Sequence, residues 1–390
     1  MKALLLKMIE DRMDEMIAIR RHLHQFPELS FAEVETAAYI KNFYAEKPVQ
    51  IDTISGRHGF VVTINPGKSE RVLALRADFD ALPMQELVES SFKSQHDGIM
   101  HACGHDLHTA ALMIAADSLI TLRDQLPITI KIIHQHAEET PPGGAVDFMN
   151  SGLLDDVTRI YGAHVMPDEK LGTIRYAKAS MMAGNAAITV DITGLGGHGA
   201  SPHLANDAIV AASQFVVATQ SIVSRRIDPQ KPAVITIGSF EGKGADNVIQ
   251  EHVHLALSTR YFEESVEKCL ESELEALCHG IAAMYKVEVR MNHLGGYPAL
   301  VNHPEVVSKI IPVLKKAAFL DTVEEIEPVP FSEDFATYLK TIPGAFLFVG
   351  SSAAPSPYFL HNPKFEADER VLVMLAQTMI ELTIAYIDEQ

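Results

Sequence analysis

The chain has 390 residues, of which 47% are hydrophobic, so it is long enough for two or three domains with a large core. Its formal net charge of −19 argues against nucleic acid and against an anionic membrane as partners, because both attract basic surfaces. Three cysteines are too few for a disulfide framework. The N-terminus lacks the apolar core of a secretory signal, and no apolar run has the length of a membrane helix. We therefore expect a cytoplasmic protein.

In the N-terminal half, the hydrophobic pattern alternates between helical and extended spacing. Apolar residues spaced along 5–17 predict an opening helix. Short β-branched runs at 59–67 and 71–83, closed by Pro, Gly or Asp, predict strands. A helix is predicted at 106–125 and a further strand at 128–139. This alternation predicts an α/β fold in which helices flank a mostly parallel central sheet.

The pattern changes near residue 185 and changes back near residue 295. Between these points the order is strand, helix, strand, strand, helix, strand, which is typical of a compact two-layer α+β unit. After them, helices and a strand return at 304–319, 344–350 and 367–387. We therefore predict one catalytic domain formed by 1–184 and 295–390, with 185–294 inserted as a second domain.

Acidic and histidine side chains stand where predicted strands of the α/β part stop. They belong to four separate segments and comprise Asp78 and Asp80, Glu138 and Glu139, His164, and His361. Active sites in open α/β sheets collect at the carboxyl ends of the strands. We expect these four loops to converge on one site.

A set of metal-binding side chains accompanies these loops. Together the set offers one thiolate, three imidazoles and a carboxylate, from Cys103, His105, Glu139, His164 and His361. These are ligand types for zinc, manganese or a related divalent ion. Because five ligands exceed the need of one tetrahedral ion, they suit a pair of ions about 3.5–4 Å apart, as in two-metal hydrolases. Glu138 would then act as the general base that takes a proton from water.

Taken singly, each of these residues has an ordinary explanation. A lone cysteine is usually a small core hydrophobe, and "HACGH" could be half of a structural zinc site, although no second cysteine pair completes it. Paired glutamates commonly lie on a solvated face, His164 could be a hydrogen-bonded core residue, and His361 could cap a turn. The joint occurrence at strand ends favours the metal site.

Eight motifs follow one another in an order that resembles a known family. They are "RRHLHQFPELSFAE", "LALRADFDALP", "MHACGHDLHTA", "AEE", "GGHGASPH", "NVI", "SEDFA" and "LHNPKF". The chain resembles the metal-dependent N-acyl-amino-acid amidohydrolases, which include bacterial aminoacylases, hippurate hydrolases and auxin-conjugate hydrolases and are related to glutamate carboxypeptidases. The resemblance covers about residues 15–385.

The resemblance implies a role for each residue of the metal site. Cys103 would bridge the two ions, with His105 and His164 completing the shell of one ion and Glu139 and His361 that of the other. Glu138 would activate water and then protonate the leaving amine. Asp78 would hold His105 in its tautomer, as the partners of metal-bound imidazoles usually do.

For the inserted domain, the resemblance implies contacts with substrate and with a second subunit. His198 of "GGHGA" would stabilise the oxyanion, from its own or a neighbouring subunit. Asn247 and Arg260 would contact the substrate, and the Arg260 guanidinium can grip a carboxylate in bidentate fashion. The same domain would form a homodimer and cover the active site.

The expected protein is an amidohydrolase with two divalent ions, zinc or manganese first and cobalt or nickel next, that cleaves N-acyl amino acids or short peptides. A deacetylase of the N-acetyl-diaminopimelate type and a dipeptidase or aminopeptidase are the alternatives, and an inactive scaffold is a remote one. "HQHAEE" departs from the usual Gln-Pro-Ala before the paired glutamates, which leaves the substrate preference open. We attribute His134, His136, Cys269 and Cys278 to packing.

Overall fold

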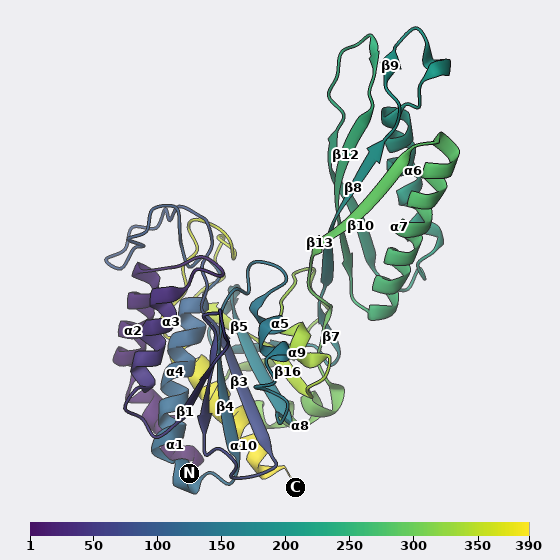
Figure 1. Cartoon of the computed structure of the whole chain (residues 1–390). Helices are drawn as coiled ribbons and strands as arrows, with labels where there is room; N and C mark the ends of the chain where they lie inside the picture. Colours follow the sequence, from purple (N-terminus) through teal and green to yellow (C-terminus); the bar gives the residue numbers. More distant parts are fainter. Residues whose placement is uncertain (390) are drawn as a thin grey trace. The chain divides into compact units, whose positions relative to one another are not determined.

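The chain folds into two compact units, seen in a computed structural model that describes residues 1–389 (Figure 1). Unit 1 comprises Met1–Ala179, Val301–Glu327 and the residues from Asp334 onward. Unit 2 comprises Ser180–Leu300 together with Pro328–Glu333. The inserted unit is therefore wider at both ends than the range 185–294 that we expected, and it takes up a short segment from later in the chain.

The centre of unit 1 is an eight-stranded sheet with the strand order β1-β2-β4-β3-β5-β16-β6-β15. Its strands are β1 (Gln50–Thr53), β2 (Phe60–Ile64), β3 (Val72–Asp78), β4 (Thr129–Gln135), β5 (Arg159–Lys170), β6 (Thr173–Tyr176), β15 (Thr322–Glu325) and β16 (Gly344–Ser352). The four central strands β4, β3, β5 and β16 are parallel, whereas β2 and β1 add an antiparallel edge. All seven residues of β3 are buried, as expected for a strand covered on both faces.

Helices cover this sheet and complete its core. They are α1 (Lys2–Glu10), α2 (Met13–Gln25), α3 (Val34–Tyr44), α4 (His105–Thr121), α5 (Gly144–Asn150), α8 (Pro304–Leu314), α9 (Ala336–Leu339) and α10 (Val371–Asp388), with a short 3₁₀ turn at Arg123–Gln125. The buried helices α4 and α10 pack against each other, with α2 over α4 and α1 over α10. The opening helix that we expected is thus two helices, which break at Asp11 and Arg12.

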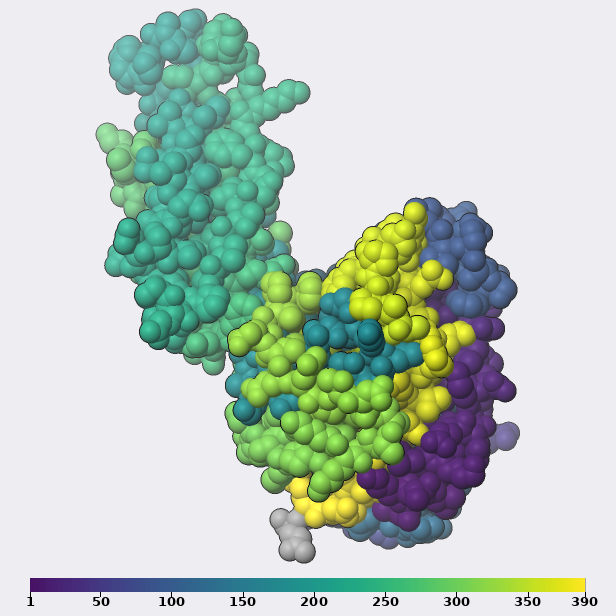
Figure 2. Space-filling model, turned by 180° about the vertical axis from the view of Figure 1, so that it is seen from behind, coloured from purple at the N-terminus to yellow at the C-terminus, as the bar shows by residue number. Residues whose placement is uncertain are grey.

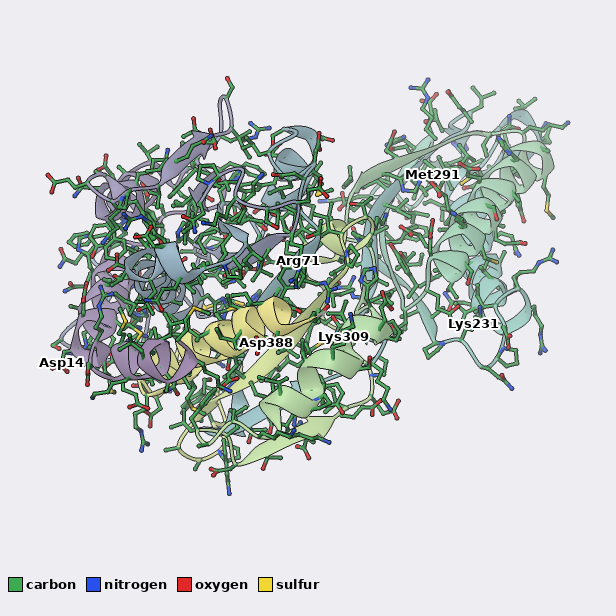
Figure 3. The ribbon with its side chains drawn as sticks, turned by 90° about the horizontal axis from the view of Figure 1, so that it is seen from below. Asp14, Arg71, Lys231, Met291, Lys309 and Asp388 are labelled. Carbon is green, nitrogen blue, oxygen red and sulfur yellow. The ribbon has the colours of Figure 1, made fainter. Side chains whose placement is uncertain are left out.

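The two ends of the chain meet in unit 1. Figure 2 shows N-terminal segments in purple beside C-terminal segments in yellow, and an ion pair of 2.7 Å joins Lys2 on α1 to Glu381 on α10. At the other end of α10, seen in the view of Figure 3, the Arg71 guanidinium donates to the carbonyls of Tyr386 and Ile387. These contacts cap the helix and bind it to the strand that carries part of the site.

Among the described residues, α10 alone is long and apolar enough to span a membrane. In the structure, 83% of that stretch is buried inside the protein. A core helix has this composition because every side faces other apolar residues.

Unit 2 is a two-layer α+β structure. A four-stranded antiparallel sheet with the order β10-β12-β8-β13 carries α6 and α7 on one face (Figure 1). Its elements are β7 (Ser180–Met182), β8 (Gly184–Thr193), β9 (Gly197–His198), a 3₁₀ turn (Pro202–Leu204), α6 (Ala208–Arg225), β10 (Ala233–Glu241), β11 (Val248–Ile249), β12 (His252–Tyr261), α7 (Glu264–Tyr285) and β13 (Glu288–Gly295), with β14 (Leu300–Val301) at the junction. The buried residues of β12 alternate strictly with less buried ones, so the strand packs one face on the helices.

Candidate metal centre

The predicted site residues of unit 1 lie at the carboxyl ends of its parallel strands. Asp78 is the last residue of β3, and Glu138 and Glu139 follow β4. His164 lies within β5, next to β16 in the parallel sheet. Cys103 and His105 stand at the start of α4, separated by Gly104 in a left-handed conformation with φ of 89°. The segment between β3 and α4 therefore places Cys103 and His105 at the edge of the sheet where the parallel strands end.

The structure brings the five expected metal ligands together. The Cys103 sulfur lies 3.3 Å from His164 Nε2, and His361 Nε2 lies 3.1 Å from Glu139 Oε1. His105 Nε2 is 3.9 Å from the same Glu139 oxygen. Donor atoms within 4.8 Å of one another form one group of Cys103, His105 and His164 and a second of Cys103, Glu139 and His361. Cys103 is the member that the two groups share.

Two buried atoms of this cluster make no hydrogen bond of good geometry. His105 Nε2 and Glu139 Oε1 are both shielded from solvent and lack such a bond among residues 1–389, although His361 Nε2 lies 3.1 Å from the carboxylate oxygen. Leaving such groups unpaired costs free energy, and native proteins rarely do so without a functional reason. An imidazole nitrogen and a carboxylate oxygen are ligands for a divalent cation, so the donor set fits a metal.

The electrostatics of Cys103 favour the same conclusion. Burial raises the pKa of its thiol well above the usual range, and the negative charges of Glu139, Glu138 and Asp78 raise it further. A thiol in such surroundings gives up its proton only when a strong positive charge is close, and a coordinated cation supplies that charge.

Asp80, and not Asp78, orients His105. The ring atom His105 Nδ1 lies 3.0 Å from the Asp80 carbonyl oxygen and 3.1 Å from Asp80 Oδ1. We expected Asp78 in this position, but its nearest approach to His105 is 3.6 Å, on the Nε2 side. The physical reason is that the two oxygens of Asp78 are occupied by Arg76 and His108, whereas Asp80 has an oxygen facing His105 Nδ1.

The carboxylate of Asp78 contacts His108, a histidine to which the sequence analysis assigned no role. His108 Nδ1 donates to Asp78 Oδ1 at 2.7 Å, and His108 Nε2 accepts the Val165 N–H at 3.0 Å. Both nitrogens of His108 are therefore occupied by the protein. His164 in turn donates its Nδ1 proton to the Val165 carbonyl at 2.7 Å, which leaves Nε2 facing the Cys103 sulfur. This arrangement fixes the tautomers of both rings.

A buried arginine lies beneath the site. The Arg76 guanidinium, in a residue only 2% exposed, donates to Asp78 at 2.7 Å, to Asp334 at 2.9 Å and to Gln135 at 2.8 Å. Burial alone would raise the pKa of Asp78, but the charge of Arg76 and of nearby histidines holds it well below its usual range. The planar guanidinium thus fixes two carboxylates at once.

Glu138, the expected base, is 6% exposed and contacts the same network. The Asp334 backbone N–H donates to Glu138 Oε1 at 3.4 Å. The side chain of Asp334 accepts from Gln135 at 2.7 and 2.8 Å and from the Ala145 N–H at 3.0 Å. The carboxylate of Glu138 therefore has a preferred direction before any substrate arrives.

The remaining expected residues lie in unit 2. His198 is exposed in β9, which pairs with β11, and its Nδ1 accepts the Ala200 N–H at 3.0 Å. The Asn247 carbonyl accepts the Gly199 N–H at 2.8 Å, so Asn247 is a neighbour of His198. Arg260 lies on β12, opposite Asn185 of β8, on the face away from the helices.

His134 and His136, which we attributed to packing, both lie inside unit 1. His134 Nε2 lies 3.0 Å from the Tyr44 hydroxyl, and its ring contacts Phe60. His136 Nε2 lies 3.1 Å from Asp147 Oδ2. Neither belongs to a metal-binding group of the described residues.

Several residues with a part in the site escaped the sequence analysis. They are Arg76, Asp80 as the partner of His105, His108 and Asp334. One signal was available, because Arg76 is a charged residue inside the apolar run "VLALRAD", and a buried charge is paired. Asp334 lies in the motif "SEDFA", but nothing local indicates that its partners are Arg76, Gln135 and Glu138.

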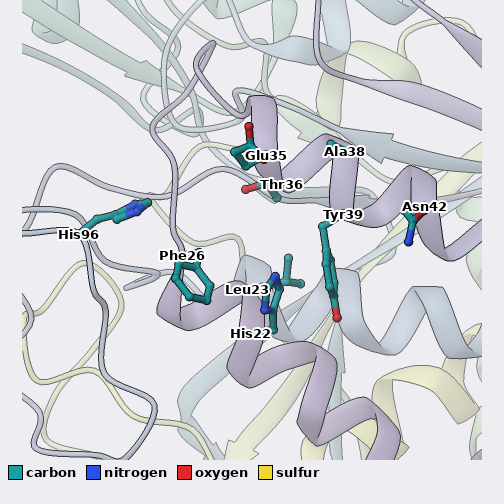
Figure 4. Close-up of a pocket in the computed structure, with 9 residues that line it drawn as sticks. All are labelled: His22, Leu23, Phe26, Glu35, Thr36, Ala38, Tyr39, Asn42 and His96. Carbon is teal, nitrogen blue, oxygen red and sulfur yellow. The ribbon is translucent and has the colours of Figure 1, made fainter.

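A separate cavity of about 460 Å³ lies between α2 and α3 (Figure 4). Its walls include stacked rings of His22 and Tyr39, whose centroids are 4.0 Å apart, with Phe26 and His96 nearby. None of its lining residues belongs to the metal centre, so the volume of this cavity says nothing about the substrate.

Residues 74–384 match the model of peptidase family M20/M25/M40. The chain belongs to this family. It is 40% identical to the "Putative amidohydrolase YhaA" of Bacillus subtilis, over 97% of this chain and 96% of the relative. It is 37% identical to the N-acetyl-L-cysteine deacetylase of the same organism, over 94% and 87% of the two chains.

Two crystal structures extend the comparison to three dimensions. One is described as "a putative aminohydrolase from methicillin resistant Staphylococcus aureus" and has 43% identity, a TM-score of 0.96 and full coverage of both chains. The other is the Bacillus subtilis YXEP protein, a dinuclear metal-binding M20 peptidase, with 30% identity, a TM-score of 0.82 and coverage of 96% and 98%. The present M20 chain is a metal-dependent hydrolase of amide bonds.

Proposed function

We propose that the protein hydrolyses N-acyl amino acids, with two divalent ions held by its five ligands. The observation that carries this proposal is the presence of Cys103 in both donor groups. His105 and His164 would hold one ion and Glu139 and His361 the other, and the Cys103 thiolate would be available to both. When bound, the ions polarise the amide carbonyl and increase the acidity of water.

Glu138 moves the proton in this proposal. Its carboxylate is buried, oriented by the Asp334 N–H, and belongs to a donor group with His105 and Glu139. From that position it can take a proton from the attacking water and return it to the nitrogen of the leaving amino acid. Asp80 keeps the Nδ1 proton of His105 in place throughout.

The donor set favours zinc or manganese. A thiolate suits a borderline ion such as zinc, whereas the imidazoles and the carboxylate suit manganese equally well. Cobalt and nickel share these ligand preferences and are the next candidates. The free thiols of all three cysteines fit a reducing compartment, which supports a cytoplasmic location.

Small N-acetyl amino acids are the first substrates to consider. The relatives at 36% and 37% identity are named N-acetyldiaminopimelate deacetylase, in Streptococcus uberis, and N-acetyl-L-cysteine deacetylase. Both names describe removal of an acetyl group from an amino acid nitrogen. A deacetylase of the diaminopimelate type is therefore the second candidate. The substrates of a dipeptidase or aminopeptidase differ from those of both deacetylases only in the acyl group on the amino acid nitrogen.

We assign unit 2 to substrate contact and to self-association. His198 would stabilise the oxyanion, while Asn247 and Arg260 would hold the polar and carboxylate groups of the amino acid. The assembly would be a homodimer, which light scattering measures directly. A monomer in solution would exclude a role of His198 across a subunit boundary.

Release of free amine from N-acetyl, N-benzoyl and aminoacyl amino acids tests the proposal. We expect turnover with added manganese or zinc and none with chelator. Glu138→Ala should abolish turnover with two ions still bound, whereas Glu89→Ala, at a highly exposed carboxylate, should not. Full turnover of Glu138→Ala in the loaded protein would contradict the mechanism. No turnover of any substrate by the wild-type protein with two bound ions would place the substrate outside this class.

A further inference from the structure

Glu33 is a buried carboxyl group that the proposed mechanism does not use. It is 0% exposed and directly precedes α3. Its Oε1 accepts the Ala137 N–H at 2.8 Å, across 104 positions of the sequence. Its Oε2 is buried and has no hydrogen-bond partner in the described part of the chain.

The partner of Glu33 has an unusual backbone. Ala137 has a φ of 52°, in the left-handed region that residues with a Cβ rarely adopt. Its N–H is bound to Glu33, and its carbonyl accepts the Gly144 N–H at 3.0 Å. A residue held in this conformation needs surrounding contacts that determine it, because the conformation itself is unfavourable.

This backbone turn directly precedes the two functional glutamates. Glu138 and Glu139 follow Ala137, and the Glu139 N–H donates to Asp80 Oδ2 at 2.9 Å. The segment is therefore held by one carboxyl group at residue 137 and by another at residue 139. A change of φ at Ala137 would rotate the chain that carries Glu138.

Glu33 is a hydrogen-bond acceptor whose protonated form is favoured at neutral pH. Burial, and secondarily the negative charge of Asp80, raises the pKa of Glu33 to about 8. A glutamine has the same shape and an acceptor oxygen, so it can replace the protonated acid. The Glu33→Gln variant therefore keeps the hydrogen bond to Ala137 while it excludes a negative charge at this position.

We propose that Glu33 is a positioning residue that holds Ala137 in its left-handed conformation and thereby directs Glu138 and Glu139 into the site. The inference rests on the proposed function, in which Glu138 moves the proton, and deepens it by adding a residue that acts through the backbone. Glu33 touches neither the ligands nor the substrate in this role.

Three variants test the contact through activity, measured on the best substrate of the wild-type protein. Glu33→Gln should keep kcat within about 3-fold, because the acceptor remains. Glu33→Leu should lower kcat by about 10–100-fold with little change in KM, since a misplaced catalytic group affects the chemical step. If Glu33→Leu does not fold, Glu33→Asp withdraws the oxygen by one methylene and should act in the same direction.

Glu28 provides a matched control. Its carboxylate accepts the N–H groups of Glu35 and Thr36 at 3.2 and 2.7 Å and so caps the same helix, α3, without reaching Ala137. Glu28→Leu should destabilise α3 and leave kcat within about 3-fold of the wild type. An equal fall in kcat for Glu28→Leu and Glu33→Leu would overturn the inference, because the effect would then come from the helix.

The Ala137→Gly variant tests the direction of the effect. Glycine adopts positive φ without the penalty of a Cβ, so it depends less on the Glu33 contact. The decrease in kcat that Glu33→Leu causes should therefore be several-fold smaller in the Ala137→Gly background than in the wild type. Equal factors in the two backgrounds would overturn the inference.

Hydrogen exchange at the Ala137 amide gives a readout that needs no substrate. The amide should be protected in the wild type and in Glu33→Gln and should exchange at least about 10-fold faster in Glu33→Leu. Unchanged exchange in Glu33→Leu would overturn the inference. If the wild type hydrolyses no amide but shows this exchange pattern, the proposed function fails and the contact stands.

Discussion

The carboxylate of Asp80 contacts two of the expected metal ligands, His105 and Glu139. One oxygen lies 3.1 Å from His105 Nδ1, and the other accepts the Ser30 hydroxyl at 2.7 Å and the Glu139 N–H at 2.9 Å. Two expected ligands, from different elements, are therefore held by the same side chain. Asp80 itself is 1% exposed, so water does not compete for these bonds.

Asp80→Asn should lower the affinity for zinc or manganese by about 10–100-fold, because its single amide oxygen can accept either from His105 or from Ser30 and Glu139, but not from both sides. Titration calorimetry on the metal-free protein measures this change. Asp52→Asn, in the exposed strand β1, is the control and should bind metal normally. Equal affinities for wild type and Asp80→Asn would show that the ligands do not depend on this contact.

A second prediction at this scale concerns pH. Burial lowers the pKa of His134 from 6.5 to about 3, so the folded state keeps the ring neutral while the unfolded state takes up a proton below pH 6.5. Stability from this group is thus complete above pH 6.5 and is lost as pH falls toward 3. Between pH 6.5 and 5 the loss should be about 2 kcal/mol.

Urea unfolding at several pH values checks this prediction. Between pH 6.5 and 3, the slope of the unfolding free energy against pH should be smaller in His134→Gln, by the amount that corresponds to about one proton taken up on unfolding. The slope, and not the stability at one pH, decides the outcome, since His134→Gln also removes packing.

The identities of the expected ligands could be predicted from the sequence, but not all their supports. Cys103, His105 and the strand-end residues are recognisable because their chemistry is unusual in such short motifs. The choice between Asp78 and Asp80 depends on where β3 ends and the chain bends, and sequence patterns locate such an end only to within one or two residues. The Asp334 contact spans 196 positions and has no local signature.

At the scale of elements, the turn between Cys103 and α4 is tightly constrained. Gly104 has a φ of 89°, and a Cβ placed there would lie 2.4 Å from the Val165 side chain. The glycine thus lets α4 begin close to β5, which carries His164. Without it, the thiol and the imidazole could not approach each other as they do.

Gly104→Ala should destabilise the metal-free protein by about 2–4 kcal/mol, through backbone strain together with the clash. Gly56→Ala is the matched control, because Gly56 has a φ of 72° with nothing within 4 Å of the added Cβ. Strain alone should cost the control about 1 kcal/mol. Urea unfolding compares the two, and equal losses would show that the approach of α4 to β5 tolerates a side chain.

The elements that the sequence predicted are those with strong hydrophobic patterns. Buried strands such as β3 and long helices such as α7 are clear because their apolar residues repeat with one period. The edge strands β1 and β15 were missed because their residues are largely exposed and polar. The break between α1 and α2 has no proline or glycine to indicate it.

At the scale of the whole molecule, unit 1 is discontinuous in sequence and closed in space. The Ala179 carbonyl accepts the Asn302 N–H at 2.9 Å, so the two ends of the insertion are adjacent. The change of pattern near residues 185 and 295 indicated an insertion. The exact limits could not be predicted, because the return segment Pro328–Glu333 is short and lacks a pattern of its own.

Replacement of residues 180–300 by a short Gly-Ser linker should leave a unit 1 that folds and binds two ions, since the junction is already closed. Turnover should fall by more than about 100-fold, because the proposed oxyanion and substrate contacts are removed. Metal titration and amine release measure the two properties separately. Retained turnover would show that His198, Asn247 and Arg260 are not required.

The contact between α1 and α10 also has a consequence for biosynthesis. The core of unit 1 combines helices from distant parts of the chain, and the expected ligand His361 is translated after all of the inserted unit. Unit 2 can therefore fold during translation, as domains generally do, before α10 is available to cover the sheet of unit 1 and before His361 can join the other expected ligands. Binding of both ions would thus follow the synthesis of unit 2, and a chain that stops before His361 would lack one of the five expected ligands.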